Sequence, residues 1–178
     1  ETVAALHSRR GILEWKQERP EPAESDLETA ISLFQKLVQD FPDVPDYCQG
    51  LMLVRLAFGE IKLARNRAPA AERIFLNLFA DGKKFSDSFP AVASRSMTLD
   101  MARVEFTGVQ LRQGRAADSV EPLEQAIARF AEFGKNDESA TPKWWQARTL
   151  VKLGLSQRAM KLPKRAIVNL QKATDILN

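Results

Sequence analysis

The sequence predicts an all-α protein, a solenoid of about four helical hairpins. Apolar residues recur with the spacing of an amphipathic helix along most of the 178 residues, and no segment alternates apolar and polar residues as a strand does. In four places a small residue is followed by a bulky apolar residue four positions later and by Ala or Leu seven positions later. These sets lie 41, 48 and 47 residues apart, a period typical of repeat proteins. They are Ala30/Phe34/Leu37, Ala71/Phe75/Leu78, Ser119/Leu123/Ala126 and Ala166/Leu170/Ala173.

Four helices are expected in the first half of the chain, with ends marked by prolines and capping residues. The first covers residues 2–18 and is broken by the proline-rich segment 19–22. The second begins at the capping box that starts with Ser25 and ends before Pro42. The third covers residues 46–65. The fourth opens at Pro69, which the first turn of a helix tolerates, and ends near Gly82.

Four more helices are expected in the second half. They cover residues 88–113, 117–134, 141–160 and 163–178. Pro122 lies beyond the positions that tolerate proline freely, so we expect a late start or a bend in the sixth helix. Pairing the helices in order gives one repeat domain, residues 1–178, with hairpins of about 1–42, 46–85, 88–134 and 141–178. An irregular eight-helix bundle is the alternative.

Composition and charge exclude several classes of protein. A chain with 44% hydrophobic and 28% charged residues is not disordered, and no run of 18 apolar residues could span a bilayer. The single cysteine, Cys48, excludes an internal disulfide and a cysteine-based zinc site. With no signal peptide, these observations favour the cytoplasm. The net charge of +3 is mild, and basic residues are interspersed with acidic ones, which argues against nucleic-acid binding.

No pattern in the sequence supports catalysis. His7 is the only histidine, and no acidic residue or nucleophile forms a known motif with it. Phosphate-binding, dinucleotide-binding and metal-binding motifs are absent from the sequence, so we expect a non-enzyme without cofactor or metal. Cys48, at the start of a helix in an apolar setting, is expected to be a packed thiol.

The hairpins resemble tetratricopeptide repeats, in which a large–small pair late in the first helix (helix A) precedes a small residue in the second (helix B). Counting back twelve residues from Ala71 and from Ala166 gives such pairs, and the third hairpin has the turn glycine in its expected place. In the first hairpin only helix B matches, because the proline-rich segment displaces helix A. The residues are Phe58–Gly59, Leu153–Gly154 and Phe106–Thr107 with Gly114. The resemblance implies a right-handed superhelix that binds a protein or peptide in a concave groove lined by helices A.

Residues 37–47 are similar to the junction between repeats in bacterial tetratricopeptide arrays that follow serine/threonine kinase domains. This resemblance implies a bacterial origin and a parent protein with further domains, of which the chain is a segment. No kinase motif is present in the 178 residues, so no kinase activity is expected of them.

The resemblance also implies which residues line the groove. In this family the groove is lined by residues at fixed distances along helix A from the glycine position. The same positions in this chain, together with two flanking arginines, form a largely apolar surface suited to an apolar segment with acidic flanks. The Lys and Asn residues of the family's carboxylate clamp are absent, so capture of chaperone C-termini is not expected. The groove residues are Leu56, Glu60, Leu63, Val104, Gly108, Leu111, Arg112, Arg148, Val151, Leu155 and Arg158. Such a groove is filled either by a partner or by another part of the same protein.

Two further features bear on partners. Trp144 and Trp145 point about 100° apart on a helix, so only one ring can face the hairpin core. The other ring either packs between repeats, which we expect, or is exposed beside Lys143 and Arg148 as a contact for a partner. No polar capping helix follows the last apolar helix, so its edge is expected to be covered by downstream repeats or by self-association. That edge comprises Ile167, Leu170, Ile176 and Leu177.

Three functions are therefore considered. The sequence favours a non-catalytic scaffold that binds a protein or peptide partner of unknown identity. The alternative is a regulatory or ligand-sensing domain that dimerises through the open C-terminal edge. A nucleic-acid-binding helical repeat ranks below both, because the repeat spacing is irregular and the arginines are not interleaved with exposed aromatic residues.

Overall fold

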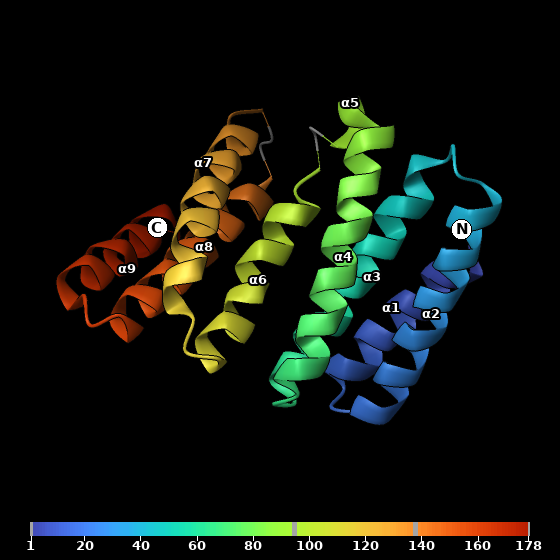
Figure 1. Ribbon diagram of the computed structural model, residues 1–178, viewed down its shortest axis with the longest axis horizontal. Coiled ribbons are helices and arrows are strands. Elements are labelled where there is room, and N and C mark those ends of the chain that lie inside the picture. Colours follow the sequence, from blue (N-terminus) through green and yellow to red (C-terminus); the bar gives the residue numbers. More distant parts are fainter. Residues whose placement is uncertain (1, 94–95, 137–138, 178) are drawn as a thin grey trace. The chain divides into compact units, whose positions relative to one another are not determined.

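A computed structural model describes residues 2–93, 96–136 and 139–177, and in these ranges it contains helices and no strand. This confirms the all-α class (Figure 1). The elements are α1 (Val3–Lys16), α2 (Pro20–Asp40), α3 (Pro45–Ala64), α4 (Ala68–Ser88), α5 (Pro90–Ala93), α6 (Thr98–Arg112), the 3-10 helix η1 (Ala116–Ser119), α7 (Val120–Asn136), α8 (Ala140–Ala159) and α9 (Pro163–Leu177).

The chain divides into two compact units between Leu99 and Asp100. In the first unit α1 pairs with α2 and α3 with α4, and α2 also packs against α3. In the second unit α7 and α9 both pack against α8, and η1 contacts α7 and α8. The first unit therefore holds two helix pairs, α1 with α2 and α3 with α4, and in the second unit α8 is the common partner of α7 and α9.

The four hairpins turn in the same way. In each hairpin a residue with left-handed backbone lies two positions after the end of the first helix, and the residue that follows it donates its amide to the carbonyl five positions back, as in the Schellman motif. The left-handed residues are Glu18 (φ 59°), Asn66 (57°), Gly114 (71°) and Lys161 (61°). The closing bonds are Arg19 to Glu14 (2.9 Å), and Arg67 to Lys62, Arg115 to Gln110 and Leu162 to Gln157 (2.8 Å each). Measured between these turns, the repeat period is 48, 48 and 47 residues.

This register corrects the first repeat. The small residue of helix B stands five positions after the left-handed residue, which in the first hairpin is the fully buried Ala23 rather than Ala30. The prediction that the second helix begins at Ser25, beyond a proline-rich segment that displaces helix A, was wrong, since α2 begins at Pro20 and holds both prolines in its first turn. Proline is tolerated there because a first-turn amide has no partner within the helix.

Other helix ends also differ from expectation. Helix α4 passes through Gly82 and ends at Ser88, and the expected long helix from residue 88 is replaced by the short α5 and by α6 from Thr98. The late start expected at Pro122 is confirmed, because η1 precedes α7 and places this proline third in the helix. At that position the missing amide again leaves no helical hydrogen bond unmade.

Helices A and B approach closely at a glycine. A Cβ atom added to Gly59 would lie 2.7 Å from the ring of Phe75, and one added to Gly11 would lie 2.9 Å from Leu27. The same atom on Gly154 would lie 3.2 Å from Leu170. In every case the bulky residue stands sixteen positions after the glycine, so the contact belongs to the repeat. The third hairpin has the fully buried Thr107 at the glycine position.

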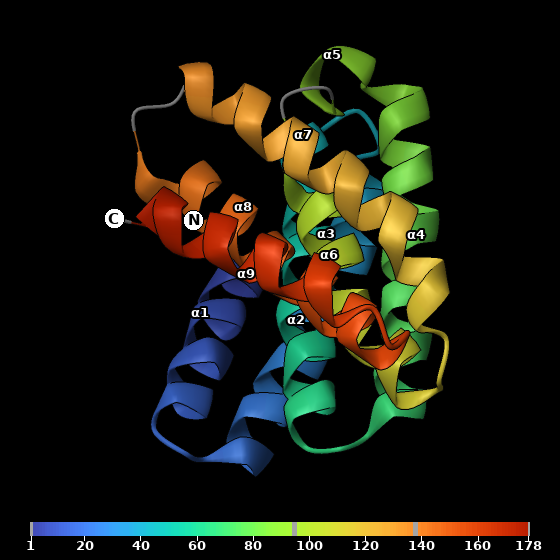
Figure 2. The same cartoon turned by 90° about the vertical axis from the view of Figure 1, so that its left-hand side faces the viewer.

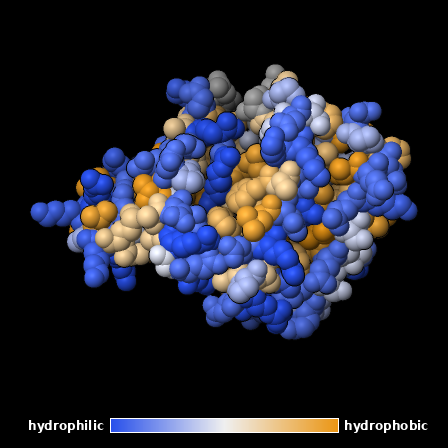
Figure 3. Space-filling model, in the orientation of Figure 1, coloured by the Kyte–Doolittle hydropathy of each residue, from blue (hydrophilic) through white to orange (hydrophobic). Residues whose placement is uncertain are grey.

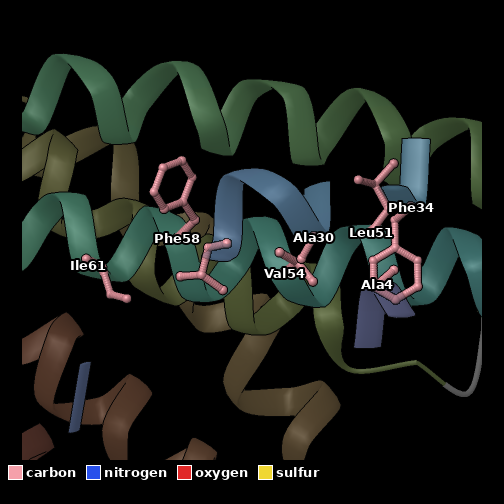
Figure 4. Packing of buried hydrophobic residues seen from close by; sticks show 8 residues of the cluster. Ala4, Ala30, Phe34, Leu51, Val54, Phe58 and Ile61 are labelled. Carbon is pink, nitrogen blue, oxygen red and sulfur yellow. The ribbon is translucent and has the colours of Figure 1, made fainter. Parts of the chain in front are cut away.

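Each unit has its own apolar core. In the first unit, Figure 4 shows side chains of α1, α2 and α3 packed together; the cluster is Ala4, Leu27, Ala30, Phe34, Leu51, Val54, Phe58 and Ile61. In the second unit, Phe130 of α7 stacks on Trp145 of α8 with ring centroids 6.1 Å apart. A second cluster there joins Ala147 and Leu150 to Ala173 of α9.

Ion pairs tie the helices of the first unit. The side chain of Asp26 on α2 is 9% exposed and pairs with Arg10, and with His7 Nδ1 at 2.9 Å, both on α1. Glu24 pairs with Lys62 of α3 at 2.6 Å and with Arg65, the residue after α3, at 2.9 Å. Arg55 of α3 pairs with Asp81 of α4. Hydrogen bonding from Arg10 holds the pKa of Asp26 below its ordinary value of 3.8.

The close contact at Gly59 makes this residue intolerant of even one added methyl group. We expect Gly59→Ala to lower the free energy of unfolding by about 1–3 kcal/mol, since Phe75 must move out of its packed position. Gly134→Ala is the matched control: its Cβ would meet only Pro142, at 3.7 Å. That substitution should raise stability by about 0.5–1 kcal/mol through helix propensity. Urea unfolding measures both, and equal effects would contradict the packing argument.

The lowered pKa of Asp26 predicts a pH dependence. Because the folded protein binds a proton at the Asp26 carboxylate less readily than the unfolded chain does, the ion pair of Asp26 with Arg10 stabilises the fold fully above pH 3.8. The contribution is lost as the pH falls through the lowered folded-state pKa. Asp26→Asn should therefore lower stability at neutral pH and flatten its decline in acid, measured by urea unfolding between neutral pH and pH about 2. Asp40→Asn, at an exposed carboxyl group, should leave the acid decline as in the wild type.

Candidate partner-binding surface

The predicted groove residues of the first unit lie on α3. Leu56 and Leu63 are buried, with 5% and 6% of their surface exposed, and Glu60 is half-buried. Both leucines are among the ten buried residues of α3, so in this structure they pack inside the unit and do not line an open surface.

The predicted residues on α6 belong to the second unit. Val104 is fully buried and Gly108 is buried, while Leu111 is half-buried. Arg112 is exposed, and its guanidinium donates to the carbonyl oxygen of Gly108 at 3.1 Å. Of the predicted residues on α6, those at its C-terminal end are therefore the accessible ones.

The remaining predicted residues come together on α8. Arg148, Val151, Leu155 and Arg158 recur at intervals of three and four residues, so they lie on one face of the helix. Val151 is 38% and Leu155 41% exposed. Trp144 begins the same face, four residues before Arg148, and is 46% exposed. We call these five residues the α8 stripe.

The two adjacent tryptophans have different roles. Trp145 is 7% exposed and stacks on Phe130 in the core, whereas Trp144 meets it edge-on with ring centroids 5.0 Å apart and reaches the surface. The expectation that both rings are packed was wrong for Trp144. The angular offset of neighbouring residues on a helix allows one ring to serve the core and leaves the other on the outer face.

An ion pair fixes the arginine of the stripe. Glu105 on α6 has a side chain only 4% exposed, and its carboxylate lies 2.5 Å from Arg148 Nε and 3.3 Å from Lys152 Nζ. The Arg148 guanidinium lies 5.1 Å from the Trp144 ring centroid, within the range of a cation–π contact. The buried carboxylate thus holds the cation against the exposed indole. No local pattern in the sequence indicates this role of Glu105, because its partners stand 43 and 47 residues away.

The stripe is suited to contact rather than to chemistry. Its side chains are an indole, two aliphatic groups and two guanidinium groups, none of which is a general base or nucleophile near neutral pH. In the described part of the chain, no three His, Cys, Asp or Glu residues are placed to hold a metal ion. Burial raises the pKa of the Cys48 thiol, so this thiol is not activated. None of the described helices is long and apolar enough to cross a membrane.

Comparison with known proteins identifies no relative. No family model matches the chain, and neither the curated proteins nor the solved structures include one with significant similarity.

The ion pair of Glu105 with Arg148 predicts that removing this buried carboxylate lowers the stability of the protein more than removing an exposed one. Glu105→Gln leaves two cations facing a neutral amide in a buried setting, and we expect a loss of about 1–3 kcal/mol. Glu132→Gln removes a carboxylate that is 67% exposed and pairs with Lys135 on the surface, so its effect should stay within about 0.5 kcal/mol. Thermal and urea unfolding measure both variants. Equal effects would show that Glu105 does not anchor Arg148.

Proposed function

We propose that the chain is a non-catalytic interaction scaffold of the tetratricopeptide type, with about four hairpins in a right-handed superhelix. The observation that carries the proposal is the α8 stripe. Its aliphatic residues Val151 and Leu155 expose apolar surface between two arginines, and Trp144 exposes its ring beyond the first of them. Exposed apolar side chains aligned along one helix are typical of a contact surface. Tryptophan and arginine are also the residue types that contribute most to binding at interfaces.

The repeat supports the architectural part of this proposal. Four turns of one kind, a period of 48, 48 and 47 residues and glycine contacts in three hairpins are what a stack of equivalent hairpins requires. In such a stack the face of helix A that is turned away from helix B remains available to a partner. On α8 that face is the stripe.

The chemistry of the stripe defines the partner's binding segment. Apolar anchors seven and four residues apart match an amphipathic helix or an extended segment with apolar side chains. Arg158 is exposed at one end of the stripe and Arg148 is partly exposed near the other, so carboxylates flanking the apolar residues would be paired. We therefore propose that the scaffold holds an apolar peptide segment with acidic flanks.

Selection from a displayed library of random peptides tests this function. Peptides enriched on the wild-type chain should carry apolar residues with acidic flanks, and Leu155→Asp should weaken their binding at least tenfold by placing a charge in the apolar contact. Leu76→Asp is the matched control, because this leucine of α4 is 54% exposed and lies outside the stripe. Enriched peptides whose affinity is unchanged by Leu155→Asp, or is reduced equally by Leu76→Asp, would refute the proposed surface.

A further inference from the structure

Each unit contains a hollow between the second helices of two neighbouring hairpins. In the second unit it lies between α7 and α9, with α8 at its base, and has a volume of about 570 Å³. Helix α8 packs against both of these helices (Figure 2). In the first unit it lies between α2 and α4, with α3 at its base, and has a volume of about 260 Å³. We call them the α7–α9 hollow and the α2–α4 hollow.

The two hollows occupy the same place in the repeat. Counted from the left-handed turn residue of each hairpin, their linings share equivalent positions on all three helices. Glu28 corresponds to Glu124, Phe58 to Leu153 and Asn77 to Lys172. The volumes and charges of the two hollows can therefore be compared directly, position by position.

An arginine fills the α2–α4 hollow. Arg55 of α3 lines this hollow and is only 7% exposed. Its guanidinium group pairs with Asp81 of α4 and donates to the carbonyl oxygen of Asn77 at 3.3 Å. The chain itself therefore supplies an aliphatic stem with a cationic end, which bridges the base and one wall of the hollow.

The α7–α9 hollow lacks this bridge. The residues equivalent to Arg55 and Asp81 are Leu150 and Ile176, so both members of the ion pair are replaced by apolar side chains. Ile176, expected at the open edge of α9, is half-buried and packs against the cluster that contains Leu150. A leucine side chain does not reach the facing wall as the arginine does, which agrees with the larger volume of this hollow.

The charges that line the α7–α9 hollow sum to one negative charge. Glu124 lies on α7, and Lys172 and Asp175 lie on α9, where hydrophilic side chains are mixed with apolar ones at the left of Figure 3. Lys172 and Asp175 are three residues apart on one helix, so their charges offset each other. Glu124 keeps the carboxylate of the first unit, but Lys62, which lies 3.9 Å from that carboxylate, is replaced by Gln157. The hollow therefore keeps the carboxylate and has neither of the two cations found in the first unit.

We propose that the α7–α9 hollow binds a small organic cation with an apolar body, of the alkylguanidinium or alkylammonium class. The apolar body lies against Ile127, Leu150 and Leu153, and the cationic head faces Glu124. This ligand has the chemistry of the Arg55 side chain, which holds the equivalent place in the first unit. The volume of about 570 Å³ lies within the range of about 300–1,000 Å³ that is usual for small-molecule sites, whereas about 260 Å³ lies below it.

This site is separate from the α8 stripe. Leu150 and Leu153 are buried and lie on the side of α8 that faces away from Val151 and Leu155. A peptide on the stripe and a cation in the hollow therefore do not compete for the same side chains, and either can bind without the other.

Nuclear magnetic resonance titration of the 178-residue chain tests the site with three probes that share a hexyl chain: hexylguanidine, hexanol and hexanoate. Hexylguanidine should shift the methyl signals of Ile127, Leu150 and Leu153 and bind more tightly than the neutral and the anionic probe. Methyl signals that do not move overturn the proposal. Hexanol or hexanoate binding as tightly as hexylguanidine also overturns it, because the carboxylates would then not select the ligand.

Removing one carboxylate tests its role in binding the cation. Glu124→Gln should weaken the binding of hexylguanidine about two- to fivefold, the effect of one exposed ion pair, and leave that of hexanol unchanged. Glu28→Gln is the matched control, because it removes the equivalent carboxylate from the hollow that Arg55 fills, and it should leave binding as in the wild type. Equal effects of the two substitutions would refute the site.

Rebuilding the bridge of the first unit tests the hollow itself. Leu150→Arg combined with Ile176→Asp should fill the hollow and abolish the binding of hexylguanidine. Circular dichroism checks that this double variant is folded, and if it is not, the comparison of Glu124→Gln with Glu28→Gln decides. A folded double variant that binds hexylguanidine as the wild type does contradicts the proposal.

Discussion

The contact between a glycine of the first helix and a bulky side chain sixteen residues later determines the geometry of these hairpins. At Gly59 and Gly11 no Cβ atom fits without moving Phe75 or Leu27, so the helix axes lie as close as side-chain packing allows. Two helices packed at so short a distance are joined here by a short turn. The left-handed residue and the Schellman bond provide that turn in all four hairpins.

This packing also decides where the other side chains go. Once glycine and alanine occupy the contact between the two helices, long charged residues lie on the remaining faces, where they pair between neighbouring helices. The pair of Glu105 with Arg148 joins α6 to α8 and at the same time holds the guanidinium beside Trp144. Glu105 therefore stabilises the contact between α6 and α8 and also positions an arginine of the proposed binding surface.

Local patterns in the sequence were enough to predict much of the fold and little of the surface. Helical periodicity and the turn at Gly114 depend on residues close in sequence, and they were predicted. The capping-box pattern at Ser25 was misleading, because Pro20 and Pro22 fit the first turn equally well and the longer helix buries Ala23. Choosing between them needs the packing of α1.

The parts of the surface that were missed depend on distant partners. The role of Glu105 rests on Arg148 and Lys152, more than forty residues away, and no local pattern announces it. The exposure of Trp144 follows only once Trp145 is seen to stack on Phe130. The groove positions transferred from the tetratricopeptide family correspond on α8 to residues that share one exposed face, but on α3 they correspond to buried leucines. The difference arises because exposure depends on what packs around each helix.

A double-mutant cycle at Gly59 and Phe75 measures the defining contact most directly. Phe75→Ala removes the ring that a Cβ atom on Gly59 would meet at 2.7 Å. If the glycine is required because of this side chain, Gly59→Ala should destabilise the wild type by about 1–3 kcal/mol and the Phe75→Ala background by clearly less. Additive effects in urea unfolding would contradict the account, because they would mean that Gly59 is not constrained by the side chain it faces.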